Sequence, residues 1–575
     1  MKVLVLAKQV PDVNMIRFDP QTNRIIRENV PLMMNSFDKK AVEEAIRISE
    51  RYGWQTCVAT MGPPQAAEML NEALRMGINE AFLITDRAFG GSDTWVTARV
   101  LARFAEKYGA DLVLTGKYSL DGETSQVPPE VATMLGVPFI PSVSKIEIGE
   151  SLTVEQEMED GLYTCTVPVP CVLSVSEKIN RARAIKPDTP QMYERIRSVD
   201  AAWLGIDVNG ARDSPTVVVG TQKVESQRNV QFIEPDGHLY EKVMEIIERS
   251  RAREEVRTVS LSNIKGEKEA WAIALDDARV SMEVASKVAE IASASGLRVR
   301  VIGNVDFRGG EAPPAHRLEV LEGGDSVAIA NYISSRIREL RPEFVLFPST
   351  TRGREVSSIV AAKLSLGLTA DCIDVSYEGG RLVQFKPAFG GGVVARIVSK
   401  TKPEMATARP GMFRVVKCDI KPEVERIRLE PASSVKYTGF TPVPSDFRPL
   451  GASRIILSIG RGIRKRENIQ KVLKLAEILG ASVGGSRPIV DMNFLPRQQQ
   501  VGLTGSAVSP DVYIAMGISG QDNHVVGIRY ANRVIAVNTD RNAPIFRYSD
   551  YGIVMDMMEF VDSFIQFLSG KQEKA

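Results

Sequence analysis

Short apolar runs rich in β-branched residues alternate with amphipathic segments along the first part of the chain. Four runs predict buried strands: residues 3–7, 56–60, 81–85 and 111–116. Two segments with apolar residues at every third or fourth position predict helices that end at Gly53 and Gly109: residues 37–53 and 94–109. This alternation favours an α/β fold, in which a mostly parallel sheet has helices on both faces.

The chain contains an internal repeat. Residues 110–140 and 342–373 share one order: a hydrophobic strand, a polar loop with glycine, a helix that ends in Leu-Gly, and a second strand. Each copy is followed by a strand that begins after a proline, at 170–175 and 403–408. The repeat predicts two related domains with mostly parallel sheets, packed as a pseudo-symmetric pair.

Three further stretches complete the predicted organisation. Residues 231–260 are rich in charge at helical spacing and predict an exposed connecting helix, whereas the prolines of 421–451 indicate a boundary. Residues 452–575 have their own alternation, with strands predicted at 452–460, 511–519, 533–540 and 551–556, and helices at 466–480 and 555–570. The predicted divisions are a first domain 1–235, a linker helix 236–257, a second domain 258–440, a hinge 441–451 and a third domain 452–575.

Composition narrows the class of protein. The 575 residues are 44% hydrophobic and 25% charged, which is close to the average of soluble globular proteins and excludes disordered, collagen-like and disulfide-scaffold proteins. None of the apolar runs approaches the ~18–20 residues that a spanning helix needs. With 72 basic and 71 acidic residues, the chain has no general attraction to nucleic acid or anionic lipid, so we expect neither nucleic-acid binding nor membrane insertion.

Cysteine and histidine are sparse. The five cysteines form no C-x-x-C pair, which favours buried thiols in a reducing compartment. The first apolar run is too short for a secretory signal, so we expect a cytoplasmic protein. The three histidines are far apart in sequence and predict no metal site. His238 and His316 lie in polar stretches and are predicted to be solvated.

Polar loops follow the predicted strands of the last domain. They are rich in Gly, Ser, Thr and Arg, and comprise residues 458–467, 484–491, 500–508, 517–524 and 536–546. In parallel α/β sheets ligands bind beyond the carboxyl ends of the strands, and glycines let backbone N–H groups approach an anion. A phosphate-bearing cofactor suits these loops, although ordinary strand-end turns have the same composition. Neither G-x-G-x-x-G nor a Walker A sequence is present.

The motifs resemble a known family. IGRG, GASVGGSRPIVD, QVGLTG, PDVYIAMGISG with a following His524, RVIAVNTD and APIFRYSDYGIV resemble, in order and spacing, the FAD-binding domain of the electron transfer flavoprotein alpha subunit. Residues 258–440 resemble the N-terminal domain of that subunit through VLFPSTTRGREVSSIVAAKLSLGLTAD. Residues 1–235 resemble the beta subunit through VLVLAKQVPD, NSFDKKAVEEA and DGETSQVPPEVATMLGVP. The resemblance implies two normally separate subunits fused in one polypeptide, with a flavodoxin-like or Rossmann-like third domain.

The resemblance also implies a set of FAD contacts. By motif these are Arg461, Ser486, Arg487, Val501, Gly502, Leu503, Thr504, Ser519, Gly520, Gln521, Asp522, Asn523, His524, Asn538, Asp550 and Tyr551. His524 corresponds to a residue beside the flavin C2 carbonyl, and Arg487 to one that lies over the ring. Two positions depart from the family pattern: Leu503 replaces a glutamine, and Asp522 brings a possible negative charge near the flavin. No catalytic residue is implied.

A second nucleotide, either AMP or another FAD, is implied for the beta-like part. The candidate contacts are Leu6, Asn35, Ser36, Phe37, Asp38, Met61, Gly116, Asp121, Gly122, Glu123, Thr124, Ser125, Gln126 and Val127. The loop DGETSQVP resembles the form found in electron-bifurcating members. A helix N-cap without a ligand is the alternative for this loop.

The family also has a partner-docking loop, which corresponds here to residues 178–191. Asn180 and Arg183 match the family pattern, but Arg181 and Ala182 replace its Glu-Pro. A generic basic loop is the alternative, and the redox partner can differ from the usual one.

The resemblance implies an electron carrier rather than an enzyme by itself. Its FAD would take electrons from a flavin dehydrogenase, such as an acyl-CoA dehydrogenase of fatty acid β-oxidation, and pass them to a membrane quinone oxidoreductase. We expect a monomer equivalent to the usual heterodimer. The alternative is an oxidoreductase, namely an electron-bifurcating flavoprotein that oxidises NADH with two FADs. A colourless adenine-nucleotide-binding regulatory protein is a third hypothesis.

Overall fold

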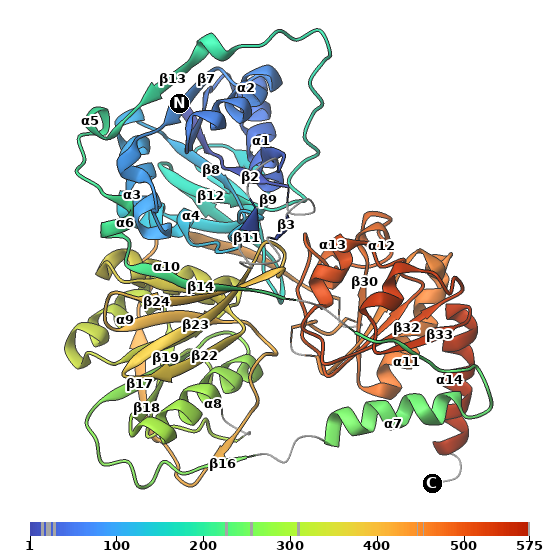
Figure 1. The fold of residues 1–575 in the computed structure, drawn as a ribbon. Coiled ribbons are helices and arrows are strands. Elements are labelled where there is room, and N and C mark those ends of the chain that lie inside the picture. Colours follow the sequence, from blue (N-terminus) through green and yellow to red (C-terminus); the bar gives the residue numbers. More distant parts are fainter. Residues whose placement is uncertain are drawn as a thin grey trace. The chain divides into compact units, whose positions relative to one another are not determined.

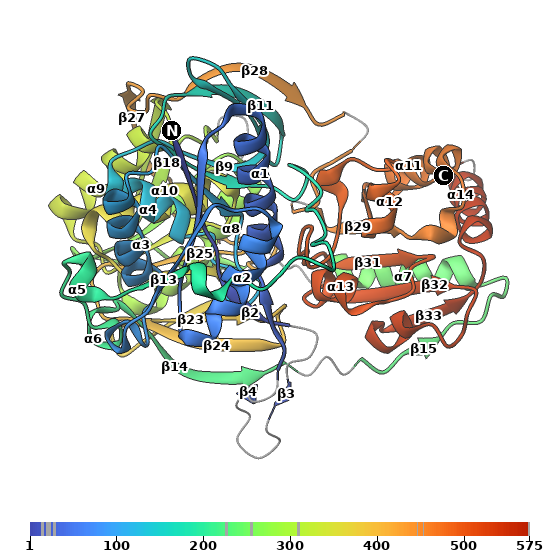
Figure 2. The same cartoon turned by 90° about the horizontal axis from the view of Figure 1, so that it is seen from above.

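The computed structural model describes residues 1–12, 17–18, 25–26, 30–224, 228–252, 257–307, 311–444, 447–451 and 453–572. These residues form two compact units (Figures 1 and 2). Unit 1 comprises Met1–Lys223, Thr258–Arg409 and Val416–Thr441, and unit 2 comprises Val224–Arg257, Pro410–Val415 and Pro442–Ala575. The predicted α/β class is confirmed, whereas the boundaries of the five predicted segments stay predictions.

Unit 1 contains a ten-stranded sheet. Its strands in spatial order are β13 (Ile196–Val199), β7 (Glu80–Ile84), β6 (Gln55–Met61), β1 (Lys2–Leu6), β8 (Leu112–Gly116), β12 (Cys171–Val175), β9 (Phe139–Ile148), β10 (Leu152–Glu157), β11 (Gly161–Val167) and β28 (Lys436–Pro442). Strands β13 to β9 are parallel, whereas β10 is antiparallel to both β9 and β11. The first four predicted strands are confirmed as β1, β6, β7 and β8.

Helices cover both faces of this sheet. They are α1 (Ser36–Tyr52), α2 (Ala67–Met76), α3 (Thr94–Tyr108), α4 (Val127–Leu135), α5 (Ala201–Leu204) and α6 (Gly210–Asp213). Alternate residues of β1 point to opposite faces. Val3 and Val5 pack with α1 and α2, whereas Leu4 and Leu6 pack with α3 and α4. The strand sequences are continuously apolar because helices cover both faces of the sheet.

The second half of unit 1 forms a seven-stranded parallel sheet. Its order is β21 (Leu368–Cys372), β25 (Glu404–Ala408), β20 (Phe344–Pro348), β17 (Glu269–Ala274), β18 (Arg298–Gly303), β19 (Arg317–Gly323) and β27 (Glu423–Leu429). Its helices are α8 (Ala278–Ser295), α9 (Ser326–Leu340) and α10 (Thr351–Leu364). The order β20–β25–β21 reproduces the order β8–β12–β9 of the first sheet. The internal repeat in the sequence is therefore also a repeat of topology.

The two halves of unit 1 exchange strands. A four-stranded antiparallel sheet has the order β14 (Thr216–Lys223), β24 (Val393–Ser399), β23 (Arg381–Ala388) and β22 (Asp374–Glu378). Strand β14 comes from the first half of the chain and pairs with β24 of the second, whereas β28 extends the ten-stranded sheet beside β11. Each half thus completes a sheet of the other. Three two-stranded sheets join β2 (Gln9–Pro11) to β5 (Leu32–Met34), β3 (Arg17–Phe18) to β4 (Ile25–Ile26), and β16 (Thr258–Val259) to β26 (Lys417–Cys418).

Unit 2 is built on a six-stranded parallel sheet. Its order is β15 (Gln231–Phe232), β33 (Tyr551–Val554), β32 (Arg533–Asn538), β31 (Val512–Met516), β29 (Ile455–Ile459) and β30 (Ser482–Gly485). The helices of this unit are α7 (Leu239–Ala252), α11 (Ile469–Leu479), α12 (Arg487–Asp491), α13 (Asp522–Val525) and α14 (Met557–Gln572). The four strands and two helices predicted for residues 452–575 are confirmed, and β30 and β15 add to them.

Two predictions about exposure are wrong. The connecting helix is α7, and it buries Leu239, Val243 and Ile247 in the core of unit 2, because these residues form one apolar stripe at i, i+4 and i+8. The stretch 421–451 contains β27 and β28, and the division between the two units at Thr441 and Pro442 falls within it. His316 is half-buried, and its ring nitrogens contact the backbone of Val299 and Leu261.

Candidate functional sites

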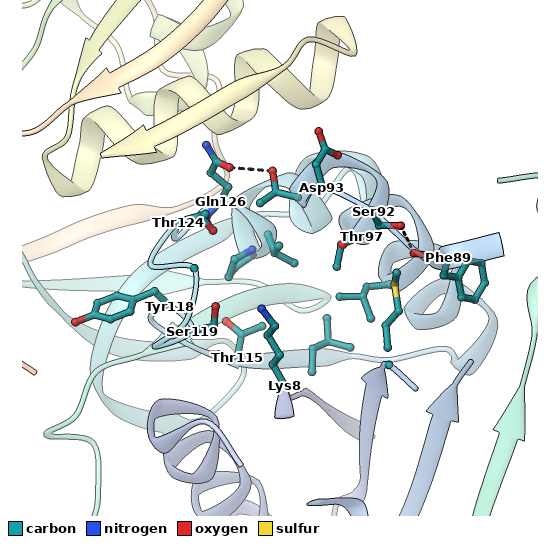
Figure 3. Close-up of a pocket in the computed structure, with 18 of the residues that line it drawn as sticks. Lys8, Phe89, Ser92, Asp93, Thr97, Thr115, Tyr118, Ser119, Thr124 and Gln126 are labelled. Carbon is teal, nitrogen blue, oxygen red and sulfur yellow. Dashed lines mark hydrogen bonds between the residues drawn. The ribbon is translucent and has the colours of Figure 1, made fainter. Parts of the chain in front are cut away.

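A cavity of about 1080 Å³ lies in unit 1, at the carboxyl ends of β1, β6, β7 and β8 (Figure 3). Nine of the predicted second-nucleotide residues line it: Leu6, Asp38, Met61, Gly116, Gly122, Thr124, Ser125, Gln126 and Val127. The cavity therefore occupies the position where parallel α/β sheets bind ligands.

The other five predicted residues lie behind the wall of this cavity. The Asn35 amide donates to the Tyr118 carbonyl at 2.9 Å and accepts from the Leu120 amide at 3.2 Å. Ser36 and Phe37 begin α1, and the Phe37 ring lies 4.7 Å from that of Tyr118. Two acidic residues make other contacts: Asp121 is paired with Lys8 at 2.7 Å, and Glu123 accepts from the Gly390 amide at 2.9 Å. These residues shape the wall and do not face its interior.

Asp38 and Gly116 join α1 to β8 at the cavity. The Asp38 carboxylate accepts the amides of Lys8 at 2.8 Å and Gly116 at 3.0 Å. A Cβ atom at Gly116 would lie 2.3 Å from that carboxylate, so only glycine fits this approach. Burial raises the pKa of Asp38 to about 7.

Two parts of the lining were not predicted from the sequence. The first is the loop between β7 and α3, whose lining residues are Thr85, Asp86, Arg87, Phe89, Gly90, Gly91, Ser92, Asp93 and Thr94. Asp93 caps α3 by accepting the Val96 amide at 3.1 Å, and the Ser92 hydroxyl donates to the Phe89 carbonyl at 2.7 Å. The sequence GGSDT, which lies between a predicted strand and a predicted helix, could have indicated this loop, because its Ser and Asp are typical of a helix N-cap.

The second missed part comes from the other half of unit 1. Its lining residues are Leu368, Thr369, Ala370, Lys386 and Ile397. They lie about 240 residues or more beyond the loop at 122–127 in sequence, so only the tertiary structure brings them to the cavity.

In unit 2 the predicted loops meet at one edge of the sheet. Arg461 follows β29, Ser486 follows β30, Ser519 follows β31 and Asn538 ends β32, and all four strands are parallel. Ser486 is the N-cap of α12 and Gln521 is the N-cap of α13. The shared edge agrees with the carboxyl-end rule on which the prediction rests.

Two of these loops are in direct contact. The Leu503 amide donates to the Asn523 carbonyl at 2.7 Å, which joins 501–504 to 521–524. Gly520 has φ +86, and a Cβ atom there would lie 2.2 Å from the Ile545 amide nitrogen. Glycine is therefore required at 520 both by its backbone conformation and by the close approach.

His524 is buried between these loops and β31. Its Nε2 lies 3.0 Å from the Tyr513 hydroxyl, and the Val501 backbone also interacts with the ring. Burial lowers the pKa of His524 to about 4, so the ring is neutral near pH 7. When Tyr513 donates to Nε2, Nδ1 carries the ring proton and can act as a donor.

Three of the charged residues predicted for this site are exposed. Arg487 begins α12, its side chain is 55% exposed, and its Nε lies 3.3 Å from the Asp491 carboxylate. Arg461 and Asp522 are also exposed. Positive charge at this edge of the sheet is thus carried on solvated side chains.

Other predicted residues hold the protein's own backbone. The Asn538 amide donates to the Ile518 carbonyl at 2.9 Å, and Asp550 accepts the Val534 amide at 2.8 Å and contacts Arg228. The Thr504 hydroxyl accepts from Gln500 at 2.9 Å. Tyr551 is half-buried at the start of β33 and packs against the core of unit 2. Arg228 and Gln500 were absent from the predicted set.

The loop at 178–191 is bound to α1. The Asn180 amide donates to the Lys40 carbonyl and the Glu44 carboxylate, both at 2.9 Å. The Arg183 guanidinium pairs with Glu43 at 2.8 Å and Glu50 at 2.7 Å. The two residues that match the family pattern therefore fix the loop, and its use as a docking site stays a prediction.

The fold and the two sets of strand-end loops define an α/β nucleotide-binding protein. A family model described as "Electron transfer flavoprotein domain" matches residues 22–201 and 317–432. A second, described as "Electron transfer flavoprotein FAD-binding domain", matches residues 449–529. The chain belongs to the electron transfer flavoprotein family, and unit 2 carries its FAD-binding domain.

Relatives match both halves of the chain. An electron transfer flavoprotein subunit beta from Thermoanaerobacterium thermosaccharolyticum is 41% identical over 261 residues, which cover 44% of this chain and 99% of that protein. A subunit alpha from Clostridium acetobutylicum is 31% identical over 307 residues, which cover 50% of this chain and 91% of that protein. The predicted fusion of beta-like and alpha-like parts is confirmed. The caffeyl-CoA reductase–Etf complex subunit CarD from Acetobacterium woodii is 45% identical over 186 residues, which cover 32% of this chain and 71% of that protein.

Two features are absent from the described residues. No helix there is long and apolar enough to cross a membrane. Within the same residues, no cluster of three or more His, Cys, Asp or Glu side chains is arranged to hold a metal ion.

Proposed function

We propose that this chain is a cytoplasmic electron carrier. In this proposal, the FAD of unit 2 receives electrons from a flavin dehydrogenase, such as an acyl-CoA dehydrogenase, and passes them to a membrane quinone oxidoreductase. The observation that carries the proposal is that the predicted flavin loops meet around the buried His524, within the part of unit 2 that matches the family's FAD-binding domain. A buried N–H group is costly unless it has an acceptor.

The residues around His524 fit a flavin. Bound FAD supplies the electron-carrying group, and the protein orients it and tunes its electronics. The neutral imidazole can donate a hydrogen bond to a carbonyl that gains negative charge on reduction, without itself changing protonation state. Gly520 lets this loop pack closely against Ile545, and Ser519 offers an exposed hydroxyl beside it. The remaining family contacts are proposed for the same edge of the sheet.

We propose a second adenine nucleotide, AMP or FAD, for the cavity of unit 1. Ligand pockets commonly enclose ≈ 300–1,000 Å³, and this one, at about 1080 Å³, is slightly larger than that range. The loop 122–127 leads into α4, whose N-terminal turn contains prolines that have no N–H to leave unsatisfied.

The size of the cavity favours a second candidate function. A dinucleotide would fill this volume more completely than a mononucleotide. In addition, one relative is named as a subunit of a caffeyl-CoA reductase–Etf complex. The second candidate is an NADH-oxidising, electron-bifurcating flavoprotein with two FADs.

Release and quantification of bound nucleotides separates the two functions. One FAD and one AMP per chain, with no bleaching of the flavin by NADH under anaerobic conditions, supports the simple carrier and eliminates bifurcation. Two FADs per chain with bleaching by NADH supports bifurcation. A colourless protein would contradict both.

A further inference from the structure

The cavity of unit 1 is built by both halves of that unit. Its floor and one side come from strand-end loops of the first half, including Thr124 and Ser125. The facing wall comes from β21 and β23 of the second half, through Thr369, Ala370 and Lys386. A ligand in this cavity would therefore contact residues that the family normally has on separate subunits.

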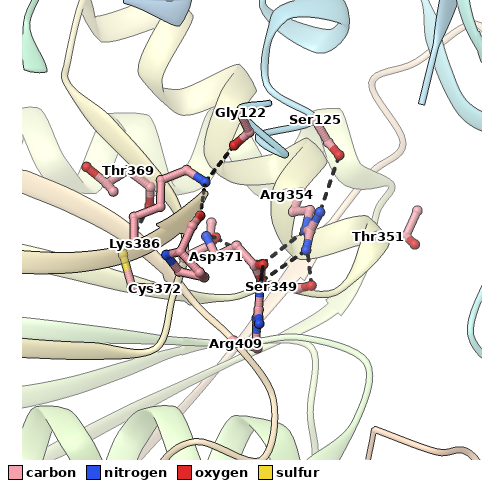
Figure 4. A network of polar contacts seen from close by, with 12 residues as sticks. Gly122, Ser125, Ser349, Thr351, Arg354, Thr369, Asp371, Cys372, Lys386 and Arg409 are labelled. Carbon is pink, nitrogen blue, oxygen red and sulfur yellow. Dashed lines mark hydrogen bonds and ion pairs between the residues drawn. The ribbon is translucent and has the colours of Figure 1, made fainter. Parts of the chain in front are cut away.

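Lys386 is a buried cation on that wall, only 6% exposed. Its Nζ donates to the Gly122 carbonyl at 2.6 Å and to the Pro387 carbonyl at 3.0 Å (Figure 4). An ammonium group has three N–H donors, so one donor remains after these two contacts. No carboxylate of the described residues lies within ion-pair distance of it.

The polar cluster around Lys386 has more positive than negative groups. Asp371 is shared between Arg354, at 3.1 Å, and Arg409. The negative charges of Glu123 and Asp371 both act on Lys386, and the Glu123 carboxylate accepts the Gly390 amide. Three cations thus face two carboxylates in a buried region, and a buried charge without a counter-charge is unfavourable. Burial accordingly lowers the pKa of Lys386.

The other cations that line the cavity differ from Lys386 in their pairing or their exposure. Lys8 is paired with Asp121, and Arg87 is exposed. The carboxylates that line the cavity accept backbone amides: Asp38 from Lys8 and Gly116, Asp86 from Ala88 and Ala201, and Asp93 from Val96 and Thr216. Lys386 is also bonded to Gly122, two residues before Thr124, so its charge lies beside the loop predicted to hold phosphate.

We propose that Lys386 binds the phosphate of the nucleotide held in this cavity, as a cation that the second half supplies to a site of the first. The proposal rests on the proposed function of the cavity as an adenine-nucleotide site. Lys386 would then be a specificity-determining residue, because it raises the affinity for a phosphorylated ligand relative to the nucleoside without phosphate. An ammonium–phosphate contact is charge-assisted and therefore among the stronger hydrogen bonds.

The test compares ligands with and without phosphate. The full-length chain, with the unit 2 flavin retained and the unit 1 nucleotide removed, is titrated calorimetrically with adenosine, AMP, FAD and inorganic pyrophosphate. The variants are Lys386→Met and, as a matched control, Lys400→Met. The Nζ of Lys400 also donates to two carbonyls, those of Ala211 at 3.0 Å and Arg212 at 3.2 Å, but Lys400 is exposed and does not line the cavity.

We expect Lys386→Met to weaken AMP binding about 10- to 100-fold, which at about 1.4 kcal/mol per tenfold is about 1.4–2.8 kcal/mol. Adenosine should bind both proteins with the same affinity to within about twofold, and Lys400→Met should match the wild type. If AMP and adenosine weaken equally, or AMP does not weaken, Lys386 only holds the Gly122 loop and the proposal is wrong. Lys386→Arg, which keeps the charge, guards against loss of folding and should retain the preference for AMP over adenosine.

Failure of the site and failure of Lys386 give different results. A wild-type chain that binds adenosine as tightly as AMP overturns the role of Lys386 and leaves the nucleotide site intact. Pyrophosphate binding that depends on Lys386, without binding of adenosine, AMP or FAD, supports the anion role and overturns the nucleotide site. A chain that binds none of the four overturns both.

Discussion

At the residue scale, the burial of His524 makes the stability of the protein depend on pH. Its folded-state pKa of about 4 lies below the usual value near 6.5, so between these pH values the unfolded chain binds a proton that the folded chain does not. The free energy of unfolding therefore rises with pH across this window, and stability is lost as pH falls from about 6.5 to 4.

We expect His524→Gln to remove this dependence, which amounts to about 3 kcal/mol over the window. The measurement is urea unfolding of the nucleotide-free chain at several pH values. His238→Gln is the control, because the His238 side chain is 74% exposed. An unchanged slope in His524→Gln would contradict the burial of this histidine.

Arg487 tests whether an exposed cation at the edge of the sheet tunes the flavin. Arg487→Ala should lower the potential of the first electron, since removal of positive charge disfavours reduction. A loss of about 1 kcal/mol of attraction corresponds to roughly 40 mV for one electron. Redox titration measures it, with Arg466→Ala as an exposed control. Equal potentials in all three proteins would remove Arg487 from the site.

At the element scale, α7 shows why one prediction failed. Its sequence is rich in charge, and that composition suggested a solvated connection. The spacing of Leu239, Val243 and Ile247 decides the outcome, because three aligned apolar residues are enough to pack a helix against a sheet. Tyr240 adds a ring contact with Phe564 at 5.1 Å.

We expect Ile247→Ala in α7 to lower the free energy of unfolding of unit 2 by about 2–5 kcal/mol, the usual cost of a large-to-small change in a core. Glu248→Ala, on the exposed face of the same helix, should change it by no more than about 0.5 kcal/mol. Urea unfolding followed by flavin absorbance reports on this unit. Equal effects of the two substitutions would mean that α7 is not part of the core.

Strand and helix patterns were predictable because each depends on local periodicity. The strands at 3–7 and 111–116 and the Leu-Gly helix ends are visible in the sequence alone, and so is the repeat that relates the two halves. Lys386 and Thr369 were not predictable as cavity residues, because nothing local marks a side chain that reaches a site in the other half. The family resemblance supplied the loops at 122–127 and 501–504 but not the partners that hold them, such as Gln500.

At the scale of the whole molecule, fusion replaces an association step. Strand β14 of the first half and β28 of the second each complete a sheet of the other half, so the two halves of unit 1 form as one body. We expect the midpoint of thermal unfolding to be independent of protein concentration over about a hundredfold range, as for an intramolecular assembly. A midpoint that rises with concentration would indicate an obligate oligomer instead.

The near-zero net charge has a consequence at this scale. With 72 basic and 71 acidic residues, the overall field does not attract a nucleotide. Any attraction has to come from individually placed groups, such as Lys386 in unit 1 and the loops around His524 in unit 2.

The central claim is that one chain holds two nucleotides, with flavin in unit 2. The most direct measurement is a visible spectrum of the purified full-length protein, followed by release and quantification of its nucleotides. The account predicts a yellow protein with FAD and a second adenine nucleotide, AMP or FAD, each at one per chain. A protein without flavin absorbance, or with a single nucleotide per chain under conditions that saturate both sites, would contradict it.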